Sequence, residues 1–227
     1  MLLLLSNFKI SINDNLYIKD PSSSDLGKKI LTNAIDMIDE IGFENFTFRK
    51  LGQKIDSPEA SIYRYFESKN QLLVYITSWY WGWMEYRLVL ETANIPSAEM
   101  RFEKSIALIT STKYDKLIIE GLKVGKLHKI LISESSKSFL TKDVDKSNKE
   151  GAFLNYKQFI ARLAETIKEI NPNYKYPHML LSTIIEGAHL QEFFAEHLPR
   201  LTNKQKSSDY ITKFYTQLGL LSIKNSK

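Results

Sequence analysis

The sequence contains no cysteine and little glycine or proline, and these absences narrow its class. Without a single cysteine in 227 residues, the chain has no disulfide, thiolate nucleophile, cysteine-ligated zinc or iron–sulfur cluster. Nine glycines and six prolines are too few for a turn-rich β-sandwich or barrel and favour long helices instead. The composition therefore predicts an all-α protein.

Long apolar runs are also missing. The apolar start, MLLLL, has no basic segment before it and polar residues follow at once, which is unlike a secretion signal. The longest later run, residues 76–90, contains Glu85 and Arg87 and is shorter than the roughly 20 apolar residues that cross a bilayer. We expect a cytoplasmic protein with no membrane partner.

Common enzyme signatures are absent as well. The sequence has no G-x-G-x-x-G after a strand, no P-loop, no H-E-x-x-H and no G-x-S-x-G, so no enzyme and no cofactor is expected. The net charge is +5, but residues 25–75 carry 7 basic and 8 acidic side chains. The overall basic character therefore does not by itself locate a nucleic-acid site.

Hydrophobic spacing divides the chain into three parts. Within an N-terminal extension at 1–24, residues 8–19 alternate in polarity around Asn13-Asp14-Asn15, which predicts a short β-hairpin. Residues 25–70 predict three short helices, and the Ser68–Gln71 capping box then opens a long one. Residues 71–227 predict a helical domain, with further helices at 97–112, 117–135 (kinked or in two pieces), 143–170, 177–198 and 202–223.

The most informative segment is 47–69, TFRKLGQKIDSPEASIYRYFESK. It predicts a helix capped by Thr47, a turn in which Ser57 caps and Pro58 begins a second short helix. Basic residues outnumber acidic ones by 5 to 3 here, which suits phosphate. A helix-turn-helix places such a second helix in the DNA major groove. From the residues alone, the alternative is a helical corner that only packs the core.

This part of the chain also resembles the TetR/AcrR family of transcriptional regulators. The likeness extends over residues 26–80 and is carried by Gly42-Phe43, FTFRKL at 46–51, IYRYF at 62–66, Ser68-Lys69 and Leu72-Leu73. It implies an N-terminal three-helix DNA-binding domain (25–70) after an N-terminal extension, followed by a C-terminal helical bundle (71–227) for effector binding and dimerisation. Gly52 and Asp56 depart from the family pattern, which usually has Ala and Gly there.

The resemblance implies which residues contact DNA. Positions at the start of the second helix, together with Tyr63 and Lys69, correspond to phosphate contacts, while Ser61, Arg64 and Tyr65 correspond to base readers. The expected DNA-binding residues are Thr47, Arg49, Lys50, Ser57, Glu59, Ala60, Ser61, Tyr63, Arg64, Tyr65 and Lys69.

Aromatic crowding and one E-x-x-H pair indicate a candidate effector site. The expected ligand-binding residues are Trp79, Trp83, Tyr86, Phe102, Tyr156, Phe159, Glu186 and His189. Each aromatic side chain also fits an ordinary core. A di-metal bundle would need a second E-x-x-H pair, so no metal is expected. The alternative function is an all-α enzyme or metal-binding protein that uses Glu186 and His189.

The last two predicted helices, 177–198 and 202–223, carry more apolar residues than one buried face needs, which favours self-association. By resemblance they pair with their two-fold mates. The resulting expectation is a homodimeric, ligand-responsive repressor that binds a quasi-palindromic operator. A third hypothesis is a dimeric interaction module without DNA binding. The sequence names neither the effector nor the operator.

Overall fold

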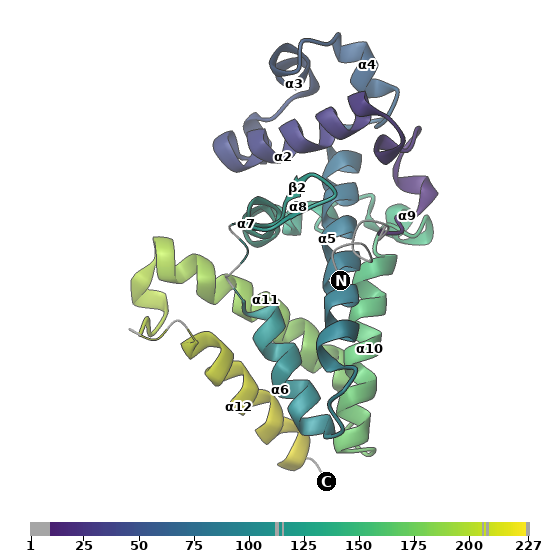
Figure 1. The fold of residues 1–227 in the computed structure, drawn as a ribbon. Coiled ribbons are helices and arrows are strands. Elements are labelled where there is room, and N and C mark those ends of the chain that lie inside the picture. The colour runs from purple at the N-terminus through teal and green to yellow at the C-terminus, as the bar shows by residue number, and fades with distance from the viewer. Residues whose placement is uncertain (1–9, 112–113, 115, 206, 208, 226–227) are drawn as a thin grey trace. The chain divides into compact units, whose positions relative to one another are not determined.

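The computed structural model describes residues 10–111, 114, 116–205, 207 and 209–225, and most of these are helical (Figure 1). They form two compact units. The first unit takes in the chain up to Trp83 and again Lys113–Asn155, and the second takes in Met84–Thr112 and Tyr156–Lys227. Helix α5 (Lys69–Thr92) contributes residues to both units. The all-α prediction is confirmed.

The N-terminal segment forms 3-10 turns, η1 (Asp14–Leu16) and η2 (Pro21–Ser23), with no strand in residues 10–24. The Asn13 side chain accepts a hydrogen bond from the Asn15 N–H at 3.0 Å. Such a bond to the backbone two residues ahead competes with strand pairing. The predicted β-hairpin is therefore wrong for these residues, while its start at Phe8 lies outside the described residues.

Three helices form the predicted DNA-binding region: α2 (Asp25–Asn45), α3 (Phe48–Lys54) and α4 (Glu59–Tyr63). Gly42 breaks the helical backbone of α2 with a φ of 74°, as its place at the end of the apolar pattern predicted. The hydroxyl of Thr47 accepts from the Lys50 N–H at 3.2 Å and caps α3, which confirms the predicted N-cap.

The turn between α3 and α4 explains both departures from the family pattern. Asp56 adopts a left-handed backbone with a φ of 52°, a conformation that Asp tolerates better than most residues. A Cβ on Gly52 would lie only 2.7 Å from the Ser57 carbonyl oxygen, so the turn needs glycine there. Ser57 does not cap α4, because the N-cap position is Pro58 and no side chain caps it.

A β-hairpin and helix α7 (Val124–Glu134) occupy the stretch predicted as a kinked helix at 117–135. The strands β1 (Ile118–Ile119) and β2 (Leu122–Lys123) pair antiparallel. The turn between them is formed by Glu120 and Gly121, whose φ values are 50° and 81°. Two consecutive left-handed residues suit a hairpin turn and exclude a helix. Short helices α8 (Ser136–Phe139) and α9 (Val144–Lys149) follow.

The second unit is built from α6 (Ala98–Ile109), α10 (Leu154–Ile170), α11 (Pro177–His197), η3 (Pro199–Leu201) and α12 (Tyr210–Asn225). The predicted helix at 143–170 is interrupted at Gly151, whose φ is 84°, so it forms α9 and α10. The last helix begins at Tyr210 rather than at Thr202. A Cβ on Gly219 would lie 2.5 Å from the Phe102 ring, which shows how closely α12 packs on α6.

Within the described residues, none of the helices combines the length and apolar character that a bilayer crossing requires.

We expect Gly52→Ala to lower the free energy of unfolding by about 1–3 kcal/mol, because the new methyl group overlaps the backbone of the turn. Gln53→Ala is the matched control, since Gln53 is exposed on the same helix and its change should stay within about 0.5 kcal/mol. Urea denaturation followed by circular dichroism measures both. Equal stability of the two variants would contradict the tight turn.

Candidate DNA interface and its supporting contacts

The exposed surface of the helix-turn-helix carries two arginines without internal partners. Arg49 lies in α3 and Arg64 ends α4, and both are exposed. Neither makes a hydrogen bond or an ion pair with the described residues. Arginine presents five N–H donors in a planar fork that matches phosphate oxygens or the major-groove edge of guanine. Both side chains are therefore available for DNA.

Thr47 and Lys50 lie together at the start of α3. The Thr47 oxygen accepts from the Lys50 N–H, which leaves the hydroxyl hydrogen available for a phosphate oxygen. The Lys50 ammonium donates to the Asn45 carbonyl at 2.8 Å and retains two further donors. Both positions suit the predicted phosphate contacts.

Tyr63 stands on the exposed side of α4. Its ring packs edge-on against Phe48, with centroids 5.1 Å apart, and 47% of the residue remains exposed. The contact fixes the ring and leaves the phenol at the surface. Of the other expected contacts in this region, Ala60 is exposed, and Ser57, Glu59 and Ser61 are partly buried.

Tyr65 does not lie on this surface, so the expectation that it reads bases is wrong. Only 3% of the residue is exposed. Its hydroxyl bonds the Ser24 hydroxyl at 2.8 Å, and its carbonyl accepts from the Ile18 N–H at 2.8 Å. Tyr65 thus fastens the N-terminal segment to the end of α4.

Lys69 also has a different role from the expected phosphate contact. Its ammonium donates to the carbonyls of Phe43, Glu44 and Phe46 at 3.0, 3.2 and 3.3 Å, and lies 4.7 Å from the centre of the Phe43 ring. An ammonium has three N–H donors, and these carbonyls engage them. Lys69 therefore caps the carbonyl end of α2.

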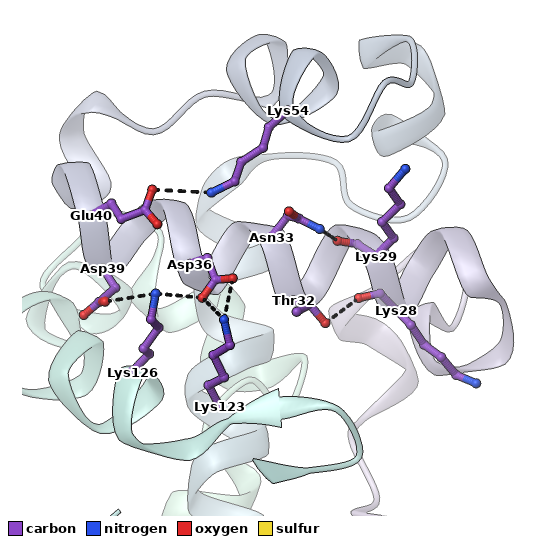
Figure 2. A network of polar contacts seen from close by, with 10 residues as sticks. All are labelled: Lys28, Lys29, Thr32, Asn33, Asp36, Asp39, Glu40, Lys54, Lys123 and Lys126. Carbon is purple, nitrogen blue, oxygen red and sulfur yellow. Dashed lines mark hydrogen bonds and ion pairs between the residues drawn. The ribbon is translucent and has the colours of Figure 1, made fainter. Parts of the chain in front are cut away.

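An ion-pair network attaches α2 to the β1–β2 hairpin and to α7 (Figure 2). Asp36 pairs with Lys123 at 2.9 Å and with Lys126 at 2.8 Å, and Lys126 also reaches Asp39 at 3.4 Å. Burial raises the pKa of Asp36, but the hydrogen bonds from Lys126 and Lys123 outweigh it and hold the pKa below its ordinary value. The network joins the DNA-binding helices to the β1–β2 hairpin and α7.

A second contact clamps the break at Gly42. The Glu134 carboxylate accepts from the Phe43 N–H at 3.1 Å and pairs with Lys137 at 2.7 Å. Lys137 in turn reaches Glu44 at 2.9 Å. Neither network was expected from the sequence, because no role was predicted for the acidic face of α2 or for the lysines near residue 125. For the first network, the sequence offers one signal: Asp36 and Asp39 are three residues apart, as are Lys123 and Lys126.

The two tryptophans expected to bind ligand belong to the first unit. The Trp79 indole donates to Glu120 at 2.9 Å. Trp83 packs against Tyr114 with ring centroids 5.2 Å apart. Both tryptophans are only 2% exposed, so they fill the core of this unit.

The other six expected ligand residues, Tyr86, Phe102, Tyr156, Phe159, Glu186 and His189, belong to the second unit. Phe102 and Phe159 are completely buried, and His189 is 5% exposed. Burial raises the pKa of the Glu186 carboxyl, and the neighbouring Tyr156 hydroxyl partly offsets that rise. Burial also raises the pKa of Tyr156, as does the neighbouring Glu186 charge. This polar group can anchor a ligand, and a single site made of all eight residues remains a prediction.

Glu186 and His189 do not assemble a metal site with the described residues, where no group of three or more His, Asp or Glu side chains is placed to hold an ion. A groove of about 880 Å³ in the second unit has charged walls instead. It contains the pair Arg162–Glu85 at 2.9 Å and the pair Arg101–Glu169. Because these ion pairs neutralise the charges that line it, the groove resembles an ordinary polar surface rather than a deep apolar ligand site.

Comparison with known proteins identifies the helix-turn-helix. Residues 30–76 match the profile described as bacterial regulatory proteins, tetR family. This range contains α3, α4 and all eleven expected DNA-binding residues. The comparison with curated proteins found no match.

Three solved structures share the fold. AibR in complex with isovaleryl coenzyme A and operator DNA is 13% identical, with 84% of this chain and 97% of that chain aligned and a TM-score of 0.58. A TetR-family transcriptional regulator from Bordetella parapertussis 12822 is 14% identical, with 87% and 95% aligned and a TM-score of 0.58. The superantigen PfiT is 13% identical, with 92% and 98% aligned and a TM-score of 0.57. At these identities the likeness establishes the fold alone, and one fold hosts several functions.

We expect Asp36→Asn to lower the free energy of unfolding by about 1–3 kcal/mol, because two lysines lose their charged acceptor. The control, Glu40→Gln, removes an exposed carboxylate with one long pair at 3.4 Å and should cost less than about 1 kcal/mol. The Asp36 pKa is lowered in the folded chain, so its contribution is present above the ordinary carboxyl pKa of about 4 and disappears as the pH falls below it. Urea denaturation at pH 7 and pH 3 measures this, and a pH-independent difference would contradict it.

Proposed function

We propose that this chain, whose residues 30–76 match the tetR family of bacterial regulatory proteins, is a member of that family and a ligand-responsive repressor that binds its operator as a homodimer. The observation that carries the proposal is the match of residues 30–76, together with the exposed Arg49, Tyr63 and Arg64 on that segment. Such a regulator acts where DNA is, so we place it in the cytoplasm.

The proposed division of labour on DNA follows from what each side chain already contacts. Thr47, Arg49, Lys50 and Tyr63 hold phosphates, because they lie at the surface with donors still available. Arg64 reads a base edge from the end of α4, since its guanidinium is exposed and has no partner among the described residues. Lys69 and Tyr65 position α2 and α4 instead of touching DNA.

Exposed apolar side chains on the last two helices support the homodimer. Seven large ones gather on α11, η3 and α12, namely Met179, Leu190, Leu198, Leu201, Phe214, Leu218 and Leu221. On α12 the last three recur at intervals of four and three residues, which places them on one stripe. An adjacent stripe of α12, with Ile211, Tyr215 and Ile223, is buried in the unit. A second copy of the chain would cover the exposed stripe.

A ligand that binds one spacing of the two DNA-binding heads more tightly than another would release the operator. The fold neighbour AibR was crystallised with isovaleryl coenzyme A and operator DNA, which supports a small-molecule effector here. The partly buried pair of Tyr156 and Glu186, with the buried His189 three residues further along α11, is the proposed anchor in the second unit. It supports a binding role better than the alternative of an enzyme or metal protein, because no third ligand accompanies Glu186 and His189 in the described residues.

The proposed function is tested by selecting random duplexes on the purified protein at fixed, near-physiological salt with competitor DNA. The salt must be fixed because phosphate contacts make affinity fall steeply with ionic strength. Recovery of a two-fold symmetric motif is the expected result, and its half-site spacing gives the separation of the heads. A protein that dimerises but recovers no motif would instead be an interaction module.

On the selected duplex, Arg64→Ala should weaken binding by about 1–3 kcal/mol and relax preference at one position in each half-site. Fluorescence anisotropy with the selected duplex and single-position variants measures this. Lys168→Ala removes an exposed positive charge from α10 in the second unit and should leave the affinity unchanged. Loss of affinity without any change in base preference would make Arg64 a phosphate contact.

Leu218→Glu should raise the dimer dissociation constant about tenfold or more, because an unpaired carboxylate in an apolar interface is costly. Sedimentation equilibrium measures the constant directly. Ser133→Glu adds the same charge at an exposed position of α7 and should leave the dimer intact. A Leu218→Glu protein that dimerises like the parent would place the interface elsewhere.

A further inference from the structure

A cavity of about 210 Å³ in the first unit has no assigned role. Residues from the N-terminal 3-10 segment, from α5 and from the tip of the β1–β2 hairpin line it. Hydrogen bonds attach the N-terminal 3-10 segment to the end of α9, because the side-chain amides of Asn13 and Asn15 each donate to the Glu150 carbonyl at 3.0 Å. The segment that forms one side of the cavity is therefore fixed by hydrogen bonds.

The rim of the cavity is acidic. Asp14, Asp20 and Glu120 all line it, and none of the ten described lining residues is basic. Each carboxylate is held in place by a donor. Asp14 accepts from the Tyr17 hydroxyl, Asp20 accepts from the Ser22 N–H at 2.8 Å, and Glu120 accepts from the Trp79 indole at 2.9 Å. These bonds orient the acids and leave their negative charge in place.

The floor of the cavity is aromatic. Tyr75 and Trp79 are 3% and 2% exposed, and Tyr17 meets Tyr75 edge-on with ring centroids 6.0 Å apart. Tyr75 lines the cavity, and its hydroxyl makes no hydrogen bond with the described residues. It shares this cavity with Asp20 and Glu120, and burial, followed by the charges of these two acids, raises its pKa. An oriented polar group without a partner marks a place for a ligand atom.

Carboxylates beside aromatic rings select an organic cation rather than a metal ion. Within the described residues, the acidic side chains form no cluster that could coordinate a metal. A quaternary or alkylated ammonium gains from both a carboxylate and the face of a Trp or Tyr ring. We propose that this cavity binds a small organic ammonium ion, with Asp14, Asp20 and Glu120 supplying charge and Tyr17, Tyr75 and Trp79 supplying the cage.

The position of the cavity also connects it to the DNA-binding helices. Glu120 begins the hairpin turn, and Lys123, two residues after Gly121, pairs with Asp36 of α2. A ligand that moves Glu120 therefore acts on the network of Figure 2 through four residues of chain. We therefore also assign the ammonium ion as an effector of DNA binding. The cation site is the first half of the proposal, and this regulatory role is the second half, which rests on the proposed function.

The test uses the full-length protein with choline and with 3,3-dimethyl-1-butanol, which has the same shape and no charge. Isothermal titration calorimetry should show choline binding and no binding of the neutral alcohol. Glu120→Gln should weaken choline binding by about tenfold, because it removes a negative charge beside the cation. Tyr75→Phe should weaken it by a smaller factor, because it removes the hydroxyl and keeps the ring of the cage. Glu103→Gln, which changes an exposed acid of α6, should bind choline as the parent does.

The outcomes separate the two halves of the proposal. Equal binding of choline and the neutral alcohol, or choline binding that survives both Glu120→Gln and Tyr75→Phe, overturns the cation site. The absence of any choline binding overturns it as well, and thermal melting confirms that each variant is folded. With the site established, choline should change the affinity for the selected duplex, and an unchanged affinity removes the effector assignment. If the duplex selection recovers no motif, the proposed regulatory function is contradicted, whereas the calorimetric evidence for the cation site is unaffected.

Discussion

The break of α2 at Gly42 is the feature on which the attachment of the DNA-binding helices depends. The last carbonyl groups of a helix have no intrahelical partner, and Lys69 of α5 donates to three carbonyls at the end of α2, after the break. Glu134 of α7 satisfies the Phe43 N–H beside them. Two distant helices thus converge on one helix end. Any movement of α5 or α7 is transmitted to α2 through these polar contacts, because buried groups cannot lose their partners cheaply.

Basic residues in the first unit have two distinct roles, which the net charge alone conceals. Lys69, Lys123 and Lys126 are paired inside the unit, whereas Arg49 and Arg64 have no partner among the described residues. The paired lysines fix the orientation of α2. The exposed arginines offer planar donors at the surface, where phosphate and guanine can be recognised. A nearly neutral region can therefore still present a positive surface to DNA.

The proposed ammonium site, the polar network of α2 and the candidate DNA interface all lie in the first unit and are connected in that order. Trp79 holds Glu120, Glu120 begins the hairpin turn, and Lys123 at the end of β2 binds Asp36. The first and last links are polar contacts and the middle link is the chain of the hairpin turn, so a displacement of Glu120 changes the geometry at Asp36. The homodimer proposed through α11 and α12 would convert such a change in each protomer into a different spacing of two recognition helices.

The sequence by itself determined the all-α class, the capped α3, the start of α5 and the break at Gly42, because local spacing and capping chemistry fix these features. It did not determine the strands at 118–123, the interruption at Gly151 or the late start of α12, since such boundaries depend on turn backbone and packing. Only the tertiary structure decided that Tyr65 is buried against Ser24 and that Lys69 caps α2. It alone also paired Asp36 with Lys123, because these partners lie 87 residues apart. Residue type and spacing indicate which side chains can bind DNA, whereas their partners in the folded chain decide which remain available to do so.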